Sequence, residues 1–295
     1  MTIILFGAGA SFGSGDVYPY PPPLGNRLYL ELRKQYSEWA SLPSDLDKKF
    51  ESNFEEGMGE IISKYGMAIS PLMQRMAVYF AGFSLRKYSN NLYVSLLREL
   101  KARGKLSETI LTTLNYECLL ETSAYVNQIE QSYFDVQPNS ANIWKIHGSC
   151  SFRHSGMNAT RGVRMSGYNL QGGFTIVNDL REIISYYNGD TSLYPAMCLF
   201  AKDKPIHVST DIILQQIERW QQLVLNAAKI IIIGVRPFKE DGHIWNFIAN
   251  SDAQVVMVGS ENEFMSWCER RRIGKRSKFL GPYWKGSEEL VYEEI

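Results

Sequence analysis

The chain has 295 residues, 45% hydrophobic and 21% charged, a globular composition with room for a large core. Lys plus Arg and Asp plus Glu number 31 each, so net charge gives no argument for nucleic acid, membrane or acidic partners. No apolar run approaches the roughly 18 residues of a membrane span, and no basic segment precedes the first apolar run. We therefore expect a soluble, cytoplasmic protein that does not bind membranes.

The cysteines argue against a metal ribbon or a disulfide framework. They lie far apart and form no C-x-x-C pair. The four are Cys118, Cys150, Cys198 and Cys268. We expect reduced, mostly buried thiols and no bound metal.

The first dozen residues join an apolar run, Ile3–Phe6, directly to the glycine-rich stretch Gly7–Ser11. Four apolar residues bounded by glycine predict a short buried strand. Glycines two apart allow a tight turn, and a helix that begins there would present N–H groups to a phosphate or pyrophosphate. A glycine-rich turn without a ligand stays open, because the third glycine of the dinucleotide fingerprint is absent.

Residues 13–23 are rich in Gly and Pro and predict a long loop, either a lid over a ligand or a plain surface loop. Apolar residues at three- and four-residue spacing then predict helices up to Arg103. These begin at Asn26 and continue at 45–65, 70–87 and 90–103. Because the rest of the chain alternates strand and helix, we interpret 26–105 as a helical insertion.

After the insertion, short apolar runs predict strands separated by helices. The strands are predicted at 109–113, 142–146, 174–177, 197–200, 229–233 and 254–258, and the helices at about 117–127, 179–187, 211–227, 242–249 and 261–271. Four consecutive isoleucines, Ile230–Ile233, are typical of a parallel strand that is covered on both faces. The glycine-rich segment 151–173 predicts a flexible loop. We expect a single α/β domain over 1–295, a Rossmann-like, mostly parallel sheet with helices on both faces and an inserted helical subdomain.

Ligands of open parallel sheets bind outside the carboxyl ends of the strands. Glycines and polar residues follow five of the predicted strands, in the order Gly7–Ser11, Asn115, His147–Gly148, Gly234–Arg236 and Gly259–Ser260. Glycines, one amide, one imidazole and one guanidinium thus converge on one edge. The sequence predicts a binding site there.

These residues resemble the motifs of the Sir2 (sirtuin) family, and most closely its bacterial antiphage-defence branch of NAD-hydrolysing proteins. The matching motifs are G-A-G-x-S in Gly7, Ala8, Gly9 and Ser11; T-x-N-x-D in Thr113, Asn115 and Glu117; L-H-G in Ile146, His147 and Gly148, extended by Ser149; and a strand that ends in glycine at Ile233–Gly234. The resemblance covers residues 1–260 in order, with a helical insertion in the corresponding place.

The chain departs from the family pattern at several positions. Glu117 stands where the family usually has Asp, and Arg236 stands where many relatives have Ser, which replaces a hydroxyl by a charge that can meet phosphate. The P-D-F-R sequence of deacylating sirtuins is absent, with Asp16 nearby but not aligned, and so are their four zinc cysteines. These absences disfavour protein deacylation.

The resemblance implies an NAD+ glycohydrolase that cleaves the nicotinamide–ribose bond to give ADP-ribose and nicotinamide. Cleavage develops positive charge on the ribose, as in glycoside hydrolysis. Asn115 would orient water or the ribose, and His147 would accept a proton near neutral pH. The resemblance implies no metal and places NAD+, the substrate, on Gly7, Ala8, Gly9, Ser11, Asp16, Thr113, Gly234, Arg236, Gly259 and Ser260.

The resemblance also implies NAD depletion in antiphage defence, a homo-oligomer and a separate partner protein. The partner would be a HerA-type hexameric ATPase or, as a second choice, an Argonaute-like protein. Two other functions stay open: a regulatory module that binds NAD or ADP-ribose without turnover, and an NAD-dependent deacylase. No motif indicates a nuclease.

Several polar residues have simpler structural interpretations. Asn115 alone is typical of a turn or helix cap and His147 alone of a core residue, but their order with the glycine loop favours function. We interpret Asp241 as the cap of the following helix and His243 as a first-turn residue, not a ligand. The basic run 269–276 is either a solvated helix end or a contact with nucleic acid or an acidic partner.

The other two histidines, His154 and His207, have no supporting residues nearby in the sequence. We expect both to lie in loops.

Overall fold

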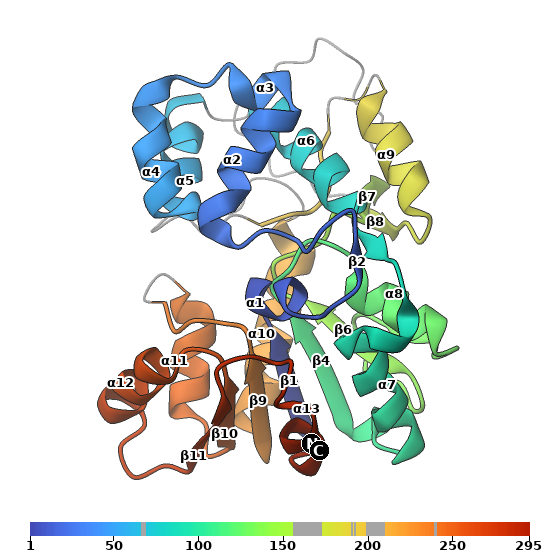
Figure 1. The fold of residues 1–295 in the computed structure, drawn as a ribbon, viewed down its shortest axis with the longest axis vertical. Helices are drawn as coiled ribbons and strands as arrows, with labels where there is room; N and C mark the ends of the chain where they lie inside the picture. The colour runs from blue at the N-terminus through green and yellow to red at the C-terminus, as the bar shows by residue number, and fades with distance from the viewer. Residues whose placement is uncertain (66–68, 156–172, 190, 192, 199–209, 239–240) are drawn as a thin grey trace.

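A computed structural model describes residues 1–65, 69–155, 173–189, 191, 193–198, 210–238 and 241–295. Within this part of the chain, seven strands form one sheet in the order β11-β10-β9-β1-β4-β6-β5, and all neighbouring strands are parallel. The strands are β1 Thr2–Phe6, β4 Thr109–Thr113, β5 Gln131–Ser132, β6 Ala141–Lys145, β9 Lys229–Ile233, β10 Gln254–Val258 and β11 Ser277–Gly281. Helices flank the sheet (Figure 1), so the predicted Rossmann-like α/β fold is confirmed.

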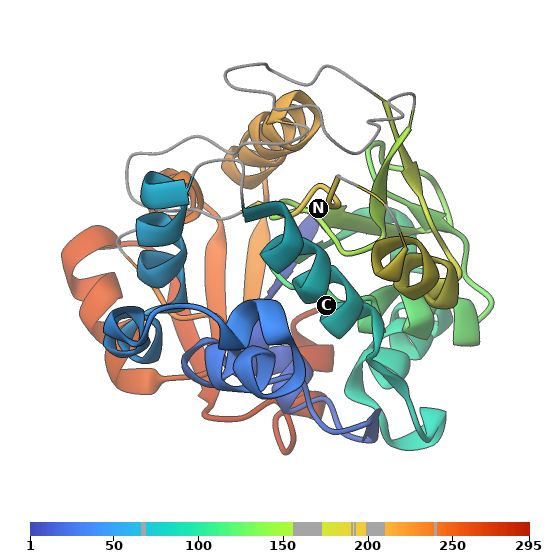
Figure 2. The same cartoon turned by 90° about the horizontal axis from the view of Figure 1, so that it is seen from above.

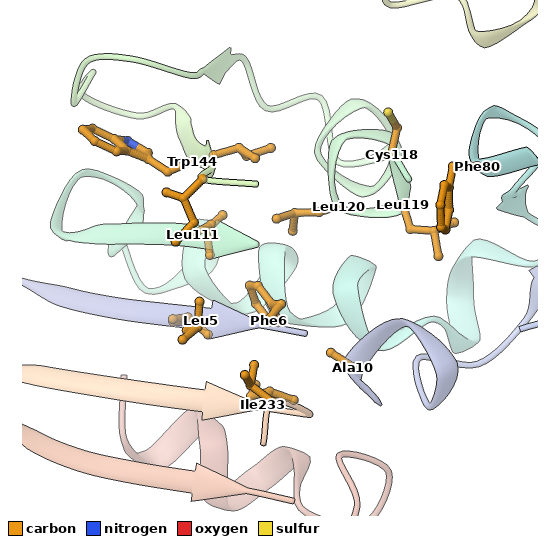
Figure 3. Packing of buried hydrophobic residues seen from close by; sticks show 14 of the residues in the cluster. Leu5, Phe6, Ala10, Phe80, Leu111, Cys118, Leu119, Leu120, Trp144 and Ile233 are labelled. Atoms are coloured by element: carbon orange, nitrogen blue, oxygen red, sulfur yellow. The ribbon is translucent and has the colours of Figure 1, made fainter. Parts of the chain in front are cut away.

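The centre of the sheet is built from the two most apolar runs of the chain. Ile3–Phe6 and Ile230–Ile233 are fully buried, and β1 lies between β4 and β9. Figure 3 shows the side chains of Leu5 and Phe6 between those of Leu111 and Ile233. Side chains buried on both faces explain why these strands are continuously apolar.

A helical lobe lies beyond the carboxyl ends of the strands, in the upper half of Figure 1. It contains α2 Gly25–Gln35, α3 Ser37–Ala40, α4 Asp47–Ser52, α5 Phe54–Tyr65 and α6 Ser70–Ala81. Tyr29 stacks on Phe50 with ring centroids 4.1 Å apart, and Trp39 packs edge-on against both rings. These aromatic contacts hold the helices of the lobe together, and the lobe falls within the stretch 26–105 that the sequence predicts to be a helical insertion, apart from its first residue.

Two helices of the predicted insertion have bounds that differ from those predicted. The predicted helix 45–65 is interrupted at Asn53, whose side-chain oxygen accepts hydrogen bonds from the N–H groups of Glu55 and Glu56 and so starts α5. The predicted helix 70–87 ends at Ala81, because Ser84–Leu85 (β3) pairs with Val17–Tyr18 (β2).

The strand β2, Val17–Tyr18, lies within the predicted loop 13–23. The helix α7, Leu92–Ala102, is capped by the side chain of Asn91 and packs against α8, Leu119–Val126, and α13, Glu288–Glu293. The last helix of the predicted insertion, α7, therefore packs against helices outside the helical lobe.

A two-stranded antiparallel sheet lies beside the helical lobe. Phe152–Ser155 (β7) pairs antiparallel with Gly173–Ile176 (β8), where the sequence predicts the start and end of a flexible loop; 156–172 lie outside the described residues. The helix α9, Leu180–Asn188, follows and packs on α6, side by side in Figures 1 and 2. In place of the predicted strand 197–200, Met197 forms a single bridge to Gly148; 199 and 200 lie outside the described residues.

The C-terminal helices are α10 Thr210–Leu225, α11 Gly242–Asn250 and α12 Glu261–Arg271. The basic run after α12 is not simply a solvated helix end. Arg272 is 2% exposed, and its guanidinium donates to the carbonyls of Ile248 and Ala253, while Lys275 donates to that of Ser251 at 2.9 Å. These two cations cap the carboxyl end of α11.

No helix in the described ranges is both long and apolar enough to cross a membrane.

Candidate active site

The glycine turn after β1 uses most of its N–H groups within the protein. The N–H of Gly7 donates to the carbonyl of Ile233 in β9 at 3.0 Å, and that of Gly9 donates to the carbonyl of Gly234, just after β9, at 3.1 Å. The N–H of Ala10 donates to the carbonyl of Gly7 at 2.9 Å. Among the described residues, the N–H of Ala8 donates to no protein atom, and Ala8 is exposed. The helix α1, Ala8–Phe12, has a single turn. The N–H groups of Gly7, Gly9 and Ala10 are therefore not available to an anion, whereas that of Ala8 has no acceptor in the described part of the chain.

The glycines are required by close packing of two turns. Gly234 has φ +66°, and a Cβ on it would lie 2.5 Å from the carbonyl carbon of Gly9 and closer still to the nitrogen of Ala10. A Cβ on Gly7 would lie 2.6 Å from the oxygen of Gly234. Backbone contact of this kind explains the glycine pattern without a ligand, so the pattern is not by itself evidence of binding.

Asn115 connects the second motif to the first. Its Nδ2 donates to the carbonyl of Gly7 at 3.0 Å and to Oγ of Ser11 at 2.8 Å, and its own N–H donates to Oγ1 of Thr113 at 3.1 Å. The predicted meeting of Asn115 with the glycine turn is thus present. Because both amide hydrogens are engaged, the side-chain oxygen of Asn115 is the atom that can accept from a water or a hydroxyl.

Ser11 lies at the centre of a buried hydrogen-bond network. It is 1% exposed; its hydroxyl donates to Oε1 of Glu117 at 2.5 Å and lies 2.9 Å from the hydroxyl of Tyr93. Oε2 of Glu117 accepts from the N–H of Leu119 at 2.7 Å, so the glutamate caps α8. Burial raises the pKa of Glu117. Ser11 therefore holds the turn in place and does not face solvent.

A buried ion pair between Lys145 and Glu121 adjoins this network. Nζ of Lys145 donates to the backbone carbonyl of Glu117 at 2.5 Å and to Oε1 of Glu121 at 2.8 Å, and the two charged side chains are 0% and 8% exposed. Burial opposes the charge of Lys145, but the nearby acidic groups, with Glu121 the strongest of them, together outweigh burial and raise the pKa of the lysine. Sequence reasoning missed Lys145, Glu121 and Tyr93, because no local pattern marks a residue that contacts the site from another element.

His147 follows β6 in a tight turn. Gly148 has φ +78°, and a Cβ there would collide with the carbonyl oxygen of Ala196. The carbonyl of His147 accepts from the N–H of Cys198 at 2.8 Å, which fixes the turn. His147 is 5% exposed, and burial together with His243 lowers its pKa well below the usual value. The imidazole is therefore neutral at pH 7.

His243 and Asp241 join His147. Nε2 of His243 lies 3.1 Å from Nε2 of His147, and ligand atoms of all three side chains lie within 4.8 Å of one another. Burial lowers the pKa of His243 to about 4. We call His147, Asp241 and His243 the histidine cluster.

The structure confirms the positions predicted for Asp241 and His243 and adds a contact that the sequence does not predict. Asp241 does occupy the N-cap position of α11, and its backbone carbonyl accepts from Ile244 and Trp245, but its side chain makes no capping hydrogen bond. His243 is a first-turn residue of α11, yet its ring meets His147. A separation of 96 positions hides this pair from any motif.

The other predicted ligand residues lie at the same edge of the sheet or beside it. Thr113 ends β4 and is buried, and Asp16 has φ +48° and accepts at its carbonyl from the N–H of Arg86. Arg236 is 63% exposed and pairs with Glu263 at 3.5 Å. The Thr113 hydroxyl accepts from the N–H of Asn115, whereas no hydrogen bond or ion pair within the described part of the chain joins the side chains of Asp16 and Arg236 to Asn115 or His147.

The turn after β10 is placed one strand further from the glycine loop than Gly234. Gly259 donates to Gly281 at 2.9 Å, and Ser260 is the N-cap of α12 without a side-chain capping bond. His154 lies in β7 and not in a loop, and His207 is outside the described residues.

The chain matches no protein-family model, and no curated protein is significantly similar to it. The resemblance to the Sir2 family therefore depends on the motif residues and their order.

Proposed function

We propose that this protein is an NAD+ glycohydrolase that cleaves the bond between nicotinamide and ribose. One observation carries the proposal: Nδ2 of Asn115 donates both to Gly7 and to Ser11, so two motifs about 100 residues apart meet at the carboxyl ends of neighbouring strands. His147 follows the next strand along, β6. This is the edge at which open parallel sheets bind ligands.

In the proposed reaction, water adds to C1′ of the ribose and nicotinamide leaves. The transition state carries positive charge on the sugar. The side-chain oxygen of Asn115 accepts a hydrogen bond from the water or a ribose hydroxyl and orients it. His147, neutral because it is buried, accepts the proton that the water loses.

The pyrophosphate of NAD+ needs N–H groups or cations. In the proposal they are supplied by the N–H of Ala8, which has no acceptor among the described residues, and by the exposed guanidinium of Arg236. Because Gly7 and Gly9 donate elsewhere, the glycine turn contributes shape more than hydrogen bonds.

The proposal extends to a role in antiphage defence by NAD depletion, in a homo-oligomer with a separate partner. A HerA-type hexameric ATPase is the first choice of partner, and an Argonaute-like protein is the second. This extension is supported by the family resemblance alone.

The test is to incubate purified protein with NAD+, alone and with proteins encoded next to it, and to quantify nicotinamide and ADP-ribose by chromatography. We expect equimolar release of both, reduced on the order of 100-fold or more in Asn115→Ala and in His147→Gln. Thermal unfolding of each variant shows whether it folds, because Asn115 also holds the glycine turn.

Intact NAD+ in all conditions contradicts the proposal. Stoichiometric NAD+ binding without release would support a regulatory binding module. Release of acyl groups from acyl-lysine peptides that depends on NAD+ would support a deacylase.

A further inference from the structure

We propose that His147, Asp241 and His243 form a binding site for a divalent transition-metal ion of the Zn2+ type. One ligand atom from each lies within 4.8 Å of the other two. Two imidazoles and one carboxylate form one of the ligand sets of three-ligand zinc centres, which keep a fourth position for water or substrate.

The separation of the two imidazole nitrogens fits a tetrahedral ion. Two Zn–N bonds of about 2.05 Å at the tetrahedral angle place the nitrogens about 3.3 Å apart. The Nε2 atoms of His147 and His243 lie 3.1 Å apart, so a shift of about 0.2 Å suffices. A carboxylate oxygen of Asp241 lies within 4.8 Å of a ring nitrogen of each histidine, so it needs to move at most about 1.5 Å to complete the triangle.

The environment also suits a cation. His147 and Asp241 are 5% and 6% exposed, and His243 is half-buried, so the ligands are largely shielded from water. Metal binding needs unprotonated imidazole, and burial keeps both rings neutral at pH 7. A direct hydrogen bond between the two neutral rings is the competing explanation for their contact.

The site would join two distant parts of the chain. His147 follows β6, and His243 lies in the first turn of α11, beyond β9; the strands β4 and β1 lie between them in the sheet. An ion bound by both parts stabilises the folded state over the unfolded chain, because the unfolded chain does not hold the ligands together.

Occupancy also has a consequence that rests on the proposed function. Nε2 of His147 cannot accept a proton while it binds a metal. Zn2+ therefore inhibits NAD+ cleavage, and a chelator restores it. Metal binding itself is measured without any activity.

The experiment titrates chelator-treated protein with Zn2+ against a competing chromophoric chelator, and with Co2+ while its visible absorption bands are recorded. We expect one ion per chain and a tetrahedral Co2+ spectrum. His243→Ala and Asp241→Asn should each weaken Zn2+ binding at least about tenfold. His154→Gln and Cys268→Ser, which change potential ligands outside the cluster, serve as matched controls and should leave the affinity unchanged.

Failure to bind a stoichiometric ion in the wild type, or equal affinity in His243→Ala, overturns the inference and favours the hydrogen bond between the rings. The two proposals fail separately. Metal binding without nicotinamide release would support the metal site and contradict the proposed glycohydrolase. Nicotinamide release without metal binding would support the glycohydrolase and contradict the metal site. If both proposals hold, Zn2+ should inhibit the His243→Ala variant less readily than the wild type. With each protein's rate expressed relative to its own metal-free rate, the Zn2+ concentration for half-inhibition should be at least about tenfold higher in the variant.

Discussion

The two groups of polar residues at the carboxyl edge of the sheet use their polar atoms differently. In the glycine cluster, which comprises Gly7–Ser11, Asn115, Glu117 and Gly234, most N–H and hydroxyl groups donate within the protein. In the histidine cluster, the buried imidazole of His147 and the half-buried imidazole of His243, both of lowered pKa, face each other beside a carboxylate. Fully paired groups hold geometry, whereas groups with perturbed pKa values are typical of reactive sites. The comparison supports the proposed division of roles, in which the glycine cluster fixes the geometry around Asn115 and the histidine cluster supplies a reactive group.

The largest effect is expected from adding a side chain at Gly234, where two backbone segments of the glycine cluster lie closest together. We expect Gly234→Ala to lower the free energy of unfolding by about 4 kcal/mol or more, because a Cβ collides with the backbone of Gly9 and Ala10. Gly104→Ala is the matched control: φ is +67° there too, but nothing lies within 4 Å of the added Cβ.

Strain alone should cost the control about 1 to 2 kcal/mol. Urea unfolding of both variants measures the difference. Equal losses would show that close packing does not explain Gly234 and would reopen a ligand as the reason for the glycine.

The hydroxyl of Ser11 tests the network itself. Ser11→Ala leaves Oε1 of Glu117 without its short hydrogen bond in a buried position, so we expect a loss of about 2 kcal/mol. Ser52→Ala, which removes an exposed hydroxyl bonded to Lys49, should stay within about 0.5 kcal/mol of the wild type. If urea midpoints of the two variants shift alike, the Ser11 network contributes no more than a surface bond.

The smallest effect concerns the charge of Glu117. Burial raises its native pKa above the unfolded value, so the carboxyl favours folding below about pH 4.5 and loses that contribution as pH rises through the native pKa. The stability of the wild type minus that of Glu117→Gln should therefore fall from pH 4 to pH 8. Urea unfolding across this range measures it. A difference that rises with pH would show that the ionised carboxylate is favoured in the fold.

Local signals made the centre of the fold predictable. Ile3–Phe6 and Ile230–Ile233 are apolar at every position, which only a strand buried on both faces explains. The edge strands β5 and β11 escaped prediction because edge positions tolerate polar residues, such as Ser277 and Lys278. The break at Asn53 depends on a cap that competes with a longer helix.

The candidate site was predictable only where motifs mark it. Asn115 and the glycine turn could be placed together, because residues that follow neighbouring parallel strands meet at one edge. The contact of His147 with His243 depends on how α11 packs, and the burial of Arg272 depends on the carbonyls that end the same helix. Neither leaves a periodic or spaced signal in the sequence.

The most direct test of the role proposed for His147 measures NAD+ binding and NAD+ cleavage on the same samples. Calorimetric titration gives the NAD+ affinity of wild-type and His147→Gln protein, and chromatography gives nicotinamide release. We expect the variant to keep its NAD+ affinity within about threefold and to lose on the order of 100-fold or more in release. Unchanged release by His147→Gln, or a wild-type protein that neither binds nor cleaves NAD+, would contradict the assignment.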